Sequence, residues 1–288
     1  MTLLSIEELL AFQKEAQDRF PGSGSVKMWG TNLTQPIHVD EREEIFVDDF
    51  RNLDNWQHEG IGYLSQPTPN VLQISCVGSA QGEVGSMAFC KQDLPDRIII
   101  EYALRVIETN GLVINFIACQ GRHGEDVLDD FPLRRGTFAD YVYSADIRSY
   151  HVSISRYDDS GNHTGVSNWR RNPGLFLMAQ QPDLCNVPYL WHRIRILKLN
   201  NTLQMWVGEK IVGGFEDLNE TPEPLPGSGK FGFRVIGRKA IVQIKNFKVF
   251  QIIKQRLAEQ KLYPMMKQAF STYQVFTGDF NSDVKLTL

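Results

Sequence analysis

One segment, from Gly121 to Tyr141, concentrates the side chains best suited to acid–base chemistry. Its first part holds a histidine and four carboxylates within eight positions: His123, Glu125, Asp126, Asp129 and Asp130. Carboxylates and imidazole act as general acids and bases, and carboxylate oxygens also bind Ca²⁺. The cationic Arg134 and Arg135 and the phenol of Tyr141 follow. A solvent-exposed loop would have a similar composition, so both interpretations remain open.

A second polar group lies on a predicted strand over residues 150–157. Side chains alternate across a strand, so one face carries the apolar set Tyr150, Val152 and Ile154. The opposite face then carries His151, Ser153, Ser155 and Tyr157. This polar face suits a ligand rich in hydroxyl groups, although a solvent-facing strand gives the same pattern.

A third group, in residues 167–174, combines Asn168, Trp169, Arg170 and Arg171. Indole rings stack on sugar rings, and guanidinium groups bind carboxylates in pairs of hydrogen bonds. The alternative interpretation is a cation–π cluster on the surface. Further upstream, Trp56 and Glu59 flank His58 just before a predicted strand, and they are also candidates for contact with substrate.

The elements that must position these groups are predominantly β-strands. Between residues 45 and 250 short runs of β-branched and aromatic residues alternate with turn residues, and no helical crossover separates them. This pattern predicts an antiparallel sandwich or jelly roll. Residues 5–20 predict a helix that begins with a capping box of Ser5 and Glu8, and residues 252–271 show a second helical pattern. We therefore expect a helical extension at 1–44, a sandwich domain at 45–250 and a helical extension at 251–288.

Composition excludes several classes of function. The 288 residues carry a formal net charge of -4, so no basic excess favours nucleic acid as a partner. The longest apolar runs are interrupted by polar residues, which argues against a membrane span. An acidic N-terminal segment without an apolar core does not fit a signal peptide and predicts a cytoplasmic protein. Four scattered cysteines without C-x-x-C spacing predict free thiols. The sequence contains neither a nucleotide-binding glycine motif nor a G-x-S-x-G elbow, so nucleotide and serine-esterase chemistry have no support.

Taken together, these segments resemble the YesU-like family of bacterial proteins, whose domain is named for its unknown function. The resemblance runs from Phe46 to Phe250 and depends on a set of short strings rather than on any one of them. The strings are Asn55-Trp56-x-x-Glu59-Gly60, Gly124-Glu125-Asp126, Arg135-Gly136, Tyr150-His151, Asn168-x-Arg170-Arg171-Asn172-Pro173-Gly174, Ala179-Gln-x-x-Asp183 and Gly229-Lys-x-Gly-Phe-Arg234.

The resemblance implies a concanavalin A-like jelly roll of two curved antiparallel sheets, with a sugar groove on the concave face. It also implies a role inside the cell in the use of plant cell-wall saccharides such as pectin and rhamnogalacturonan. The E-x-D-x-x-E strand of retaining β-glucanases with this fold does not occur in the chain, which excludes catalysis by that scheme.

Two enzymatic hypotheses follow for acidic oligosaccharides. A hydrolase would use Glu125 or Asp126 as acid or base, with Glu59 or Asp129 as the partner. A lyase would neutralise a uronate carboxylate with arginine and abstract the proton at C5 with histidine or tyrosine. The candidate arginines are Arg134, Arg170 and Arg171, and the candidate bases are His151, Tyr141 and Tyr150.

A lectin-like module is the alternative, with Trp169, Asn168, His151 and the arginines holding a sugar without turnover. A scaffold built on the terminal helices has less support, although those helices could join copies of the chain in a homo-oligomer. We expect no cofactor, apart from the option of a structural Ca²⁺ ion at Asp126, Asp129 and Asp130.

Overall fold

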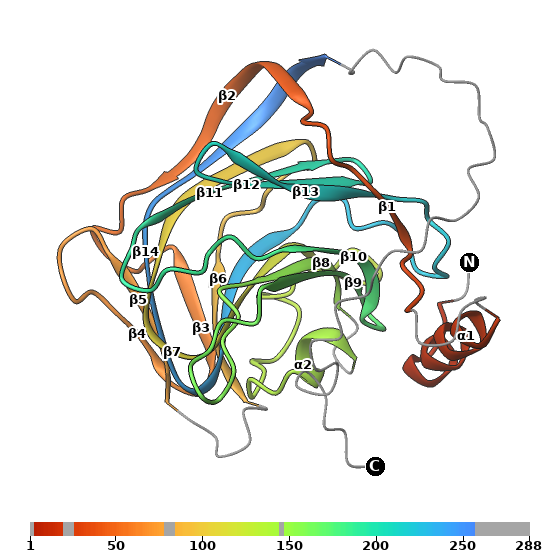
Figure 1. Cartoon of the computed structure of the whole chain (residues 1–288), viewed down its shortest axis with the longest axis horizontal. Coiled ribbons are helices and arrows are strands. Elements are labelled where there is room, and N and C mark those ends of the chain that lie inside the picture. Colours follow the sequence, from red (N-terminus) through yellow and green to blue (C-terminus); the bar gives the residue numbers. More distant parts are fainter. Residues whose placement is uncertain (1–2, 20–25, 78–83, 144–146, 257–288) are drawn as a thin grey trace.

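Strands β7 (Ile98–Gly121) and β14 (Lys230–Arg256) form one long antiparallel ribbon that organises the molecule. The computed structural model describes residues 3–19, 26–77, 84–143 and 147–256. Pairing of the ribbon runs from Ile98 opposite Gln251 to Cys119 opposite Lys230, with register shifts along the way. One shift lies between Ile236 and Lys239, beside Gly111. The ribbon bends and serves two layers of the sandwich (Figure 1).

The other strands add to the two halves of this ribbon. The first layer extends the half that contains residues 98–109 and 239–256; its strands are β1 (Gly30–Asn32), β2 (His38–Asp48), β4 (Tyr63–Ser65), β5 (Leu72–Val77), β11 (His192–Leu199), β12 (Thr202–Val207) and β13 (Lys210–Asp217). The second layer extends the half that contains residues 112–121 and 230–236; its strands are β3 (Trp56–Gly60), β6 (Gly85–Cys90), β8 (Ile147–Ile154), β9 (Val166–Asn172) and β10 (Phe176–Pro182). The predicted all-β sandwich is therefore confirmed.

The core lies between the layers and is rich in aromatic rings. Phe233 of the second layer packs edge-on against Tyr102 of the first layer at 4.9 Å between ring centres. Phe215 and Tyr150 make a similar contact at 5.3 Å. Alternation along each strand places these rings inward and leaves the intervening side chains on the outer faces. All four cysteines are free and buried, as the sequence predicted.

The two chain ends differ from the predicted helical extensions. Helix α1 (Ile6–Asp18) forms with the predicted capping box, and its Leu9 is fully buried. β1 and most of β2 also lie before residue 45, so the predicted domain boundary falls inside a strand. At the other end, Ile252–Arg256 continue β14 and pair with β2, so the helix predicted from Ile252 is wrong for these residues. Its remaining residues lie outside the described part of the chain.

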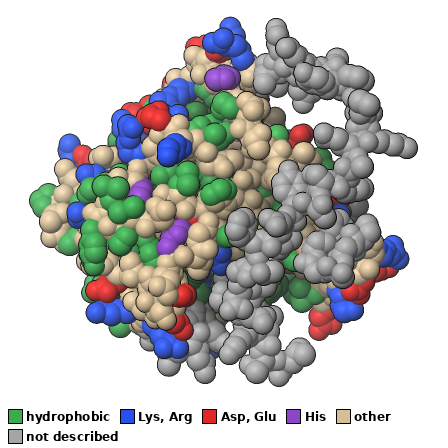
Figure 2. Space-filling model, in the orientation of Figure 1, with side chains coloured by type: hydrophobic (Ala, Val, Ile, Leu, Met, Phe, Trp, Pro, Cys, Tyr) green, Lys and Arg blue, Asp and Glu red, His purple; other side chains and the backbone are tan. Residues whose placement is uncertain are grey.

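Both described helices are short, with 13 and 4 residues. No described helix is long and apolar enough to cross a membrane. On the face shown in Figure 2, Lys and Arg side chains lie beside Asp and Glu in several small groups.

The bend of the ribbon generates a stability prediction. A Cβ atom at Gly237, where φ is +147°, would lie 2.0 Å from the carbonyl oxygen of Asn110. We expect Gly237→Ala to lower the free energy of unfolding by about 2 kcal/mol or more, because the backbone conformation and the clash both disfavour alanine. Gly227→Ala is the matched control, since no atom lies within 4 Å of a Cβ there. Equal denaturant midpoints for the two variants would contradict the assigned role of the bend.

Candidate functional site

The outer surface of the second layer carries the candidate site. We call this surface the α2 face, because the short helix α2 (Ala139–Val142) lies beside it (Figure 1). Strand register orders its side chains into two rows across the sheet. One row contains Glu59, Met87, Arg234, Ile114, Ser153, Asn168 and Gln180. The next contains Gln57, Phe89, Gly232, Phe116, His151, Arg170 and Leu177.

The segment between β7 and β8 covers the middle of these rows. Tyr141 and Val142 of α2, together with Val127, pack against Phe89 and Phe116 in a separate apolar cluster. Burial of this cluster removes apolar surface from water and holds the covering segment on the sheet. Gly136 approaches the backbone of β3 so closely that a Cβ would lie 2.5 Å from Cα of Gly60. The candidate site therefore lies under this covering segment rather than in an open groove.

A buried ion pair ties the covering segment to β3. Arg134 donates from Nε and Nη2 to the two carboxylate oxygens of Glu59, at 2.7 and 2.5 Å. The Tyr141 hydroxyl donates to Oε2 of Glu59 at 3.1 Å. Burial raises the pKa of the Glu59 carboxyl, while Arg134 and Tyr141 oppose that rise. With both oxygens bound by the protein, Glu59 positions Arg134 and is poorly placed to exchange protons with a ligand.

Arg234 lies at the centre of the α2 face and is completely buried. Its guanidinium stacks near the rings of Tyr141 and Phe138, at 4.8 and 5.8 Å from the ring centres. Nη2 donates to the Gly136 carbonyl at 2.8 Å, but Nε and Nη1 are buried without a hydrogen-bond partner. Buried donors are rarely left unpaired, because each lost hydrogen bond costs free energy. These two nitrogens therefore indicate a place where an acceptor is missing.

His151 lies one row away and is neutral at physiological pH. Burial and the positive charges of Arg170 and Arg234 hold its pKa well below the usual range. The Asn172 side-chain amide contacts Nδ1 at 2.9 Å, while Nε2 has no protein partner among the described residues. The ring packs against Phe116 at 5.1 Å. His151 therefore presents Nε2 of its neutral imidazole to the α2 face.

Positive charge exceeds negative charge in this part of the fold. Three guanidinium groups, of Arg134, Arg170 and Arg234, interact electrostatically with groups of the site. The carboxylates that do so are Glu59 and Asp140. At low dielectric an uncompensated charge is costly, so an anion at this place would be stabilised. A carboxylate fits the planar donors of an arginine particularly well.

Several residues predicted from the sequence do come together here. Glu59, Arg134, Tyr141, His151 and Arg170 all contribute to the α2 face or its covering segment, and Asn168 lies in the first row, where Gln180 donates to its side chain at 2.9 Å. The alternation predicted from residue 150 is confirmed as far as Ile154, where β8 ends, because Tyr150 points into the core and His151 points out. Beyond the strand it fails: Ser155 has a φ of +49°, and Tyr157, which was predicted on the polar face, lies in the core cluster.

Four other predicted binding residues belong to the inner core instead: Trp56, Tyr150, Trp169 and Arg171. Trp169 is completely buried, and Arg171 pairs with Asp217 at 2.8 Å, where Asp217 also accepts from the Tyr150 hydroxyl. Trp56 donates from its indole to Asp48 at 2.8 Å. Their assignment as substrate-binding residues is corrected, because strand alternation turns them away from the α2 face.

The acidic loop serves a different purpose from the predicted one. Glu125 accepts from the His123 backbone N–H at 2.9 Å and lies against Gly121, and these local hydrogen bonds lower its pKa. Asp126 pairs with Lys230 at 2.9 Å. Burial would raise the pKa of Asp126, but the Leu128 N–H and Lys230 lower it. Both carboxylates stabilise a turn beyond the end of β7, while His123 and Arg135 are exposed.

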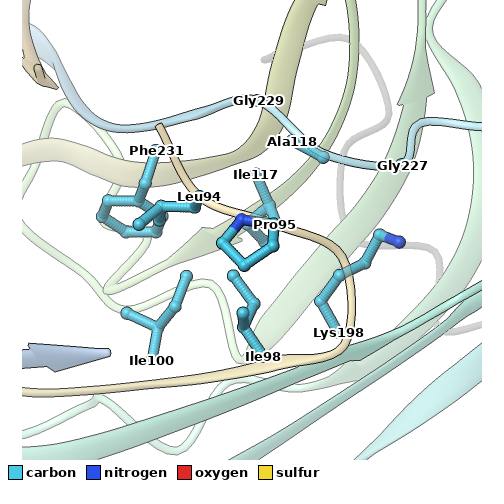
Figure 3. Close-up of a pocket in the computed structure, with 10 residues that line it drawn as sticks. All are labelled: Leu94, Pro95, Ile98, Ile100, Ile117, Ala118, Lys198, Gly227, Gly229 and Phe231. Atoms are coloured by element: carbon cyan, nitrogen blue, oxygen red, sulfur yellow. The ribbon is translucent and has the colours of Figure 1, made fainter. Parts of the chain in front are cut away.

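Other features of the described chain do not offer a better site. No group of three His, Cys, Asp or Glu side chains among the described residues lies close enough to hold a metal ion. The hollow in Figure 3 lies between apolar side chains such as Leu94 and Ile117, with the amine of Lys198 directed away from them. It leaves no room for a water molecule. Lys198 is instead held by Asp96 at 2.6 Å.

Sequence reasoning did not count Arg234 or Phe138 among the candidate site residues, although Arg234 ends one of the strings that carry the family resemblance. Arg234 stands between the core residues Phe233 and Val235, so its outward position follows from strand alternation. A cationic residue in the middle of such an apolar strand is a signal that could have been recognised. Phe138 belongs to an irregular segment, and nothing in its local sequence indicates that it lies near His151 at 6.1 Å between ring centres.

Comparisons with known proteins place these features in a family. Residues 45–249 match a family described as a domain of unknown function, DUF1961. The uncharacterized protein YesU of Bacillus subtilis is 28% identical over 209 residues, which cover 70% of this chain and 91% of YesU.

Solved structures share the architecture. A protein of unknown function with a galectin-like fold from Bacillus subtilis is 26% identical, with a TM-score of 0.65 over 73% of this chain and 98% of that chain. A non-specific endo-β-1,3(4)-glucanase of family GH16 is 8% identical, with a TM-score of 0.51 over 78% of this chain and 97% of the glucanase. At that level of identity the likeness demonstrates the fold alone.

The ion pair between Glu59 and Arg134 predicts a strong energetic coupling. We expect Arg134→Met to lower the free energy of unfolding by about 3 kcal/mol, because it leaves the Glu59 carboxylate buried without its cation. The double variant Glu59→Gln/Arg134→Met should be more stable than Arg134→Met alone. Arg51→Met, which breaks an exposed pair with Asp49, should change stability by less than about 1 kcal/mol. Additive effects in urea unfolding would argue against the coupling.

The buried neutral His151 predicts a specific pH dependence. Its pKa is lower in the folded protein than in the unfolded chain, so the unfolded chain binds the extra proton in acid. This contribution should be constant above about pH 6.5 and should destabilise the fold below it, by up to about 1.4 kcal/mol per pH unit. We expect His151→Gln to lose less stability than the parent between about pH 7.5 and pH 5. The exposed His123→Gln is the control, and identical acid profiles for all three proteins would refute the assignment.

Proposed function

Because the chain belongs to the DUF1961 family, which agrees with the expected YesU-like relationship, we propose its function from the geometry of the α2 face. The protein is a carbohydrate-active protein that takes acidic oligosaccharides of the plant cell-wall, pectic or rhamnogalacturonan type. It acts on them as a lyase inside the cell. The shared sandwich fold is compatible with this proposal, but the fold alone does not identify a reaction.

The observation that carries the proposal is the pairing of Arg234 with His151. Arg234 is completely buried and keeps two N–H groups without acceptors, and its charge depresses the pKa of the nearby imidazole. A uronate supplies what this arrangement lacks, because its carboxylate can accept from the guanidinium. A neutral sugar offers no negative charge to balance the arginines.

Access to Arg234 requires a movement of the chain. The guanidinium is shielded by Phe138 and Tyr141, whereas Phe138, Tyr143 and Arg170 are themselves partly exposed. Outward displacement of α2 would uncover the two rows while the pair of Glu59 and Arg134 keeps the start of the covering segment in place. Arg170 would then meet an incoming carboxylate before Arg234 does.

The proposed reaction is a β-elimination on the uronate. With the Asn172 side chain turned so that its oxygen accepts from Nδ1–H, Nε2 of His151 takes the proton from C5, and the electrons of that bond form the C4–C5 double bond. The bond from C4 to the glycosidic oxygen breaks, and the departing oxygen takes a proton from water. The arginines stabilise the negative charge that develops on the carboxylate in the transition state. A neutral histidine of low pKa is available as a base at neutral pH.

Hydrolysis receives less support from the same geometry. It requires two carboxyl groups on opposite sides of one bond, about 5–5.5 Å apart for retention and about 6.5–9.5 Å for inversion. Glu59 is bound by Arg134 and Tyr141, and Glu125 and Asp126 stabilise the turn beyond β7. None of the three is free on the α2 face, so the lyase hypothesis is preferred.

A lectin-like function is the second candidate, and one contact favours it. With the Asn172 amide nitrogen directed at Nδ1, His151 carries its proton on Nε2 and acts as a hydrogen-bond donor to a sugar. If the amide turns over, its oxygen accepts from Nδ1–H and Nε2 becomes the base that elimination requires. The orientation of Asn172 therefore separates binding from turnover.

Mass spectrometry of the products from a panel of pectic oligosaccharides tests the proposal. We expect two fragments whose masses sum to that of the substrate, one of them unsaturated. His151→Gln should lower turnover at least about 100-fold while acidic oligosaccharides still bind, because it removes the base. Asn172→Asp, which always accepts from Nδ1–H, should retain more activity than Asn172→Leu. The control Arg51→Gln alters an exposed arginine of another surface and should turn over normally.

Each other result of this assay has a definite meaning. Products whose masses sum to that of the substrate plus one water identify a hydrolase and overturn the lyase mechanism. Binding without products, with affinity lost in Arg234→Met, supports the lectin-like function instead. If no acidic oligosaccharide binds, or if Arg234→Met binds acidic oligosaccharides with the same affinity and the same stoichiometry as the parent, the α2 face is not the site.

A further inference from the structure

A second hollow lies on the opposite side of the sandwich, on the outer face of the first layer. This groove has a volume of about 290 Å³ and lies over β7, β11 and β14. Its lining includes the charged residues Glu101, Arg193, Arg195, Glu209 and Lys248. The volume is just below the range of about 300–1,000 Å³ that is typical of small-molecule sites. We call it the charged groove.

Strand register explains why the surface is hollow at this place. Ala103 of β7 lies between Arg193 on β11 and Lys245 on β14, and its small side chain forms the floor. In the neighbouring row Glu101 lies between Arg195 and Lys248. A β-bulge between Lys245 and Lys248 adds the exposed Asn246, whose φ is +56°, to the rim. The hollow is therefore built into the pairing of regular strands.

The groove is positively charged in a chain whose net charge is -4. Six cations line the groove, pair with a residue of its lining or occupy an adjoining row of the sheet: Arg42, Arg105, Arg193, Arg195, Lys245 and Lys248. The carboxylates that pair with them are Glu44, Glu101 and Glu209. A single carboxylate, that of Glu101, serves both Arg42 at 2.6 Å and Arg195 at 3.0 Å. Six cations and three carboxylates leave an excess that favours an anionic ligand.

Two of these cations converge on one indole ring. Lys245 Nζ lies 4.3 Å from the centre of the Trp191 ring, and the Arg105 guanidinium lies 4.5 Å from it. Arg105 donates to the neutral Gln243, and no described carboxylate forms an ion pair with Lys245. Like charges held near one ring repel each other, so a bound anion between them would be stabilised.

An exposed aromatic residue, Tyr189, lies two positions before Trp191 in the chain. Tyr189 is 68% exposed, and its φ of +64° is unusual for a bulky residue. Its backbone N–H donates to the Val106 carbonyl at 2.9 Å, which holds it next to Arg105. Exposed aromatic rings bury apolar area when they stack against the face of a sugar. Tyr189 therefore offers an aromatic surface on which a sugar ring could stack, next to the cations that could bind a carboxylate.

We propose that the charged groove is a second saccharide-binding site, which takes a single sugar acid at the outer face of the first layer. Arg193 and Lys245, on either side of Ala103, hold the carboxylate. Tyr189 and Trp191 contact the ring, and Asn246 and Glu209 bind its hydroxyl groups. The site is separated from the α2 face by the core, so it does not depend on the function proposed for that face.

Titration with D-galacturonate and with D-galactose, which differ by the carboxylate, tests this site in the full-length protein. Binding is followed by chemical shifts of the backbone amides of Ala103, Arg193 and Lys245 and by the fluorescence that is lost in Trp191→Phe. We expect galacturonate to bind at least about tenfold more tightly than galactose, and added salt to weaken it. Lys245→Gln and Arg193→Gln should each weaken binding about tenfold, because each removes one cation.

Ala103→Met fills the groove without a change of charge, and we expect it to abolish the same signals. Arg234→Met is the matched control, because it should leave galacturonate binding at the groove intact even if it destroys binding at the α2 face. Inorganic phosphate tests for a simple anion site. Equal affinity for galactose, equal affinity for phosphate, or unchanged binding in both Ala103→Met and Lys245→Gln would overturn the proposal.

Discussion

The continuous pairing of β7 with β14 is the constraint on which the rest of the molecule depends. One ribbon supplies central strands to both layers, so its bend beside Gly111 and Gly237 determines how the layers face each other. The inner residues of its two halves meet in the core, where Tyr102 contacts Phe233. Its outer residues include Arg234 in one layer and Glu101 in the other. Both candidate binding surfaces are therefore outer faces of the same two strands.

Buried charge is treated differently inside the core and on the α2 face. Within the core Arg171, Asp217 and Tyr150 form a compact group in which the carboxylate is bound from two sides. On the α2 face the carboxylate of Glu59 is fully bound, but Arg234 keeps two unpaired nitrogens. The first arrangement stabilises the fold, whereas the second leaves a requirement that an anion can meet. Arg171 also keeps one buried nitrogen, Nε, without a hydrogen-bond partner, so the difference lies in the carboxylate: Asp217 pairs with Arg171, whereas no described carboxylate forms an ion pair with Arg234.

Local pattern was sufficient for the sandwich, the capping box of α1 and the opposite orientations of Tyr150 and His151, because each depends on neighbouring residues. It could not identify which arginine meets which carboxylate. Glu59 and Arg134 are 75 residues apart, and Arg171 and Asp217 are 46 apart. The apolar spacing after residue 250 also fits a strand that pairs with β2, so the expected helix failed where tertiary pairing decided the outcome. The acidic loop was misassigned because its composition is the same in a turn as in an active site.

The covering segment of the α2 face is one uninterrupted stretch of chain between β7 and β8, whereas the rows beneath it come from seven strands. Its length and sequence can therefore diversify without altering the strand pairing that maintains the scaffold. Exchange of this single loop between relatives would replace the covering segment and leave the two rows of side chains beneath it unchanged. The covering segment can therefore change and alter ligand selectivity, whereas the paired strands must remain constant for the chain to fold.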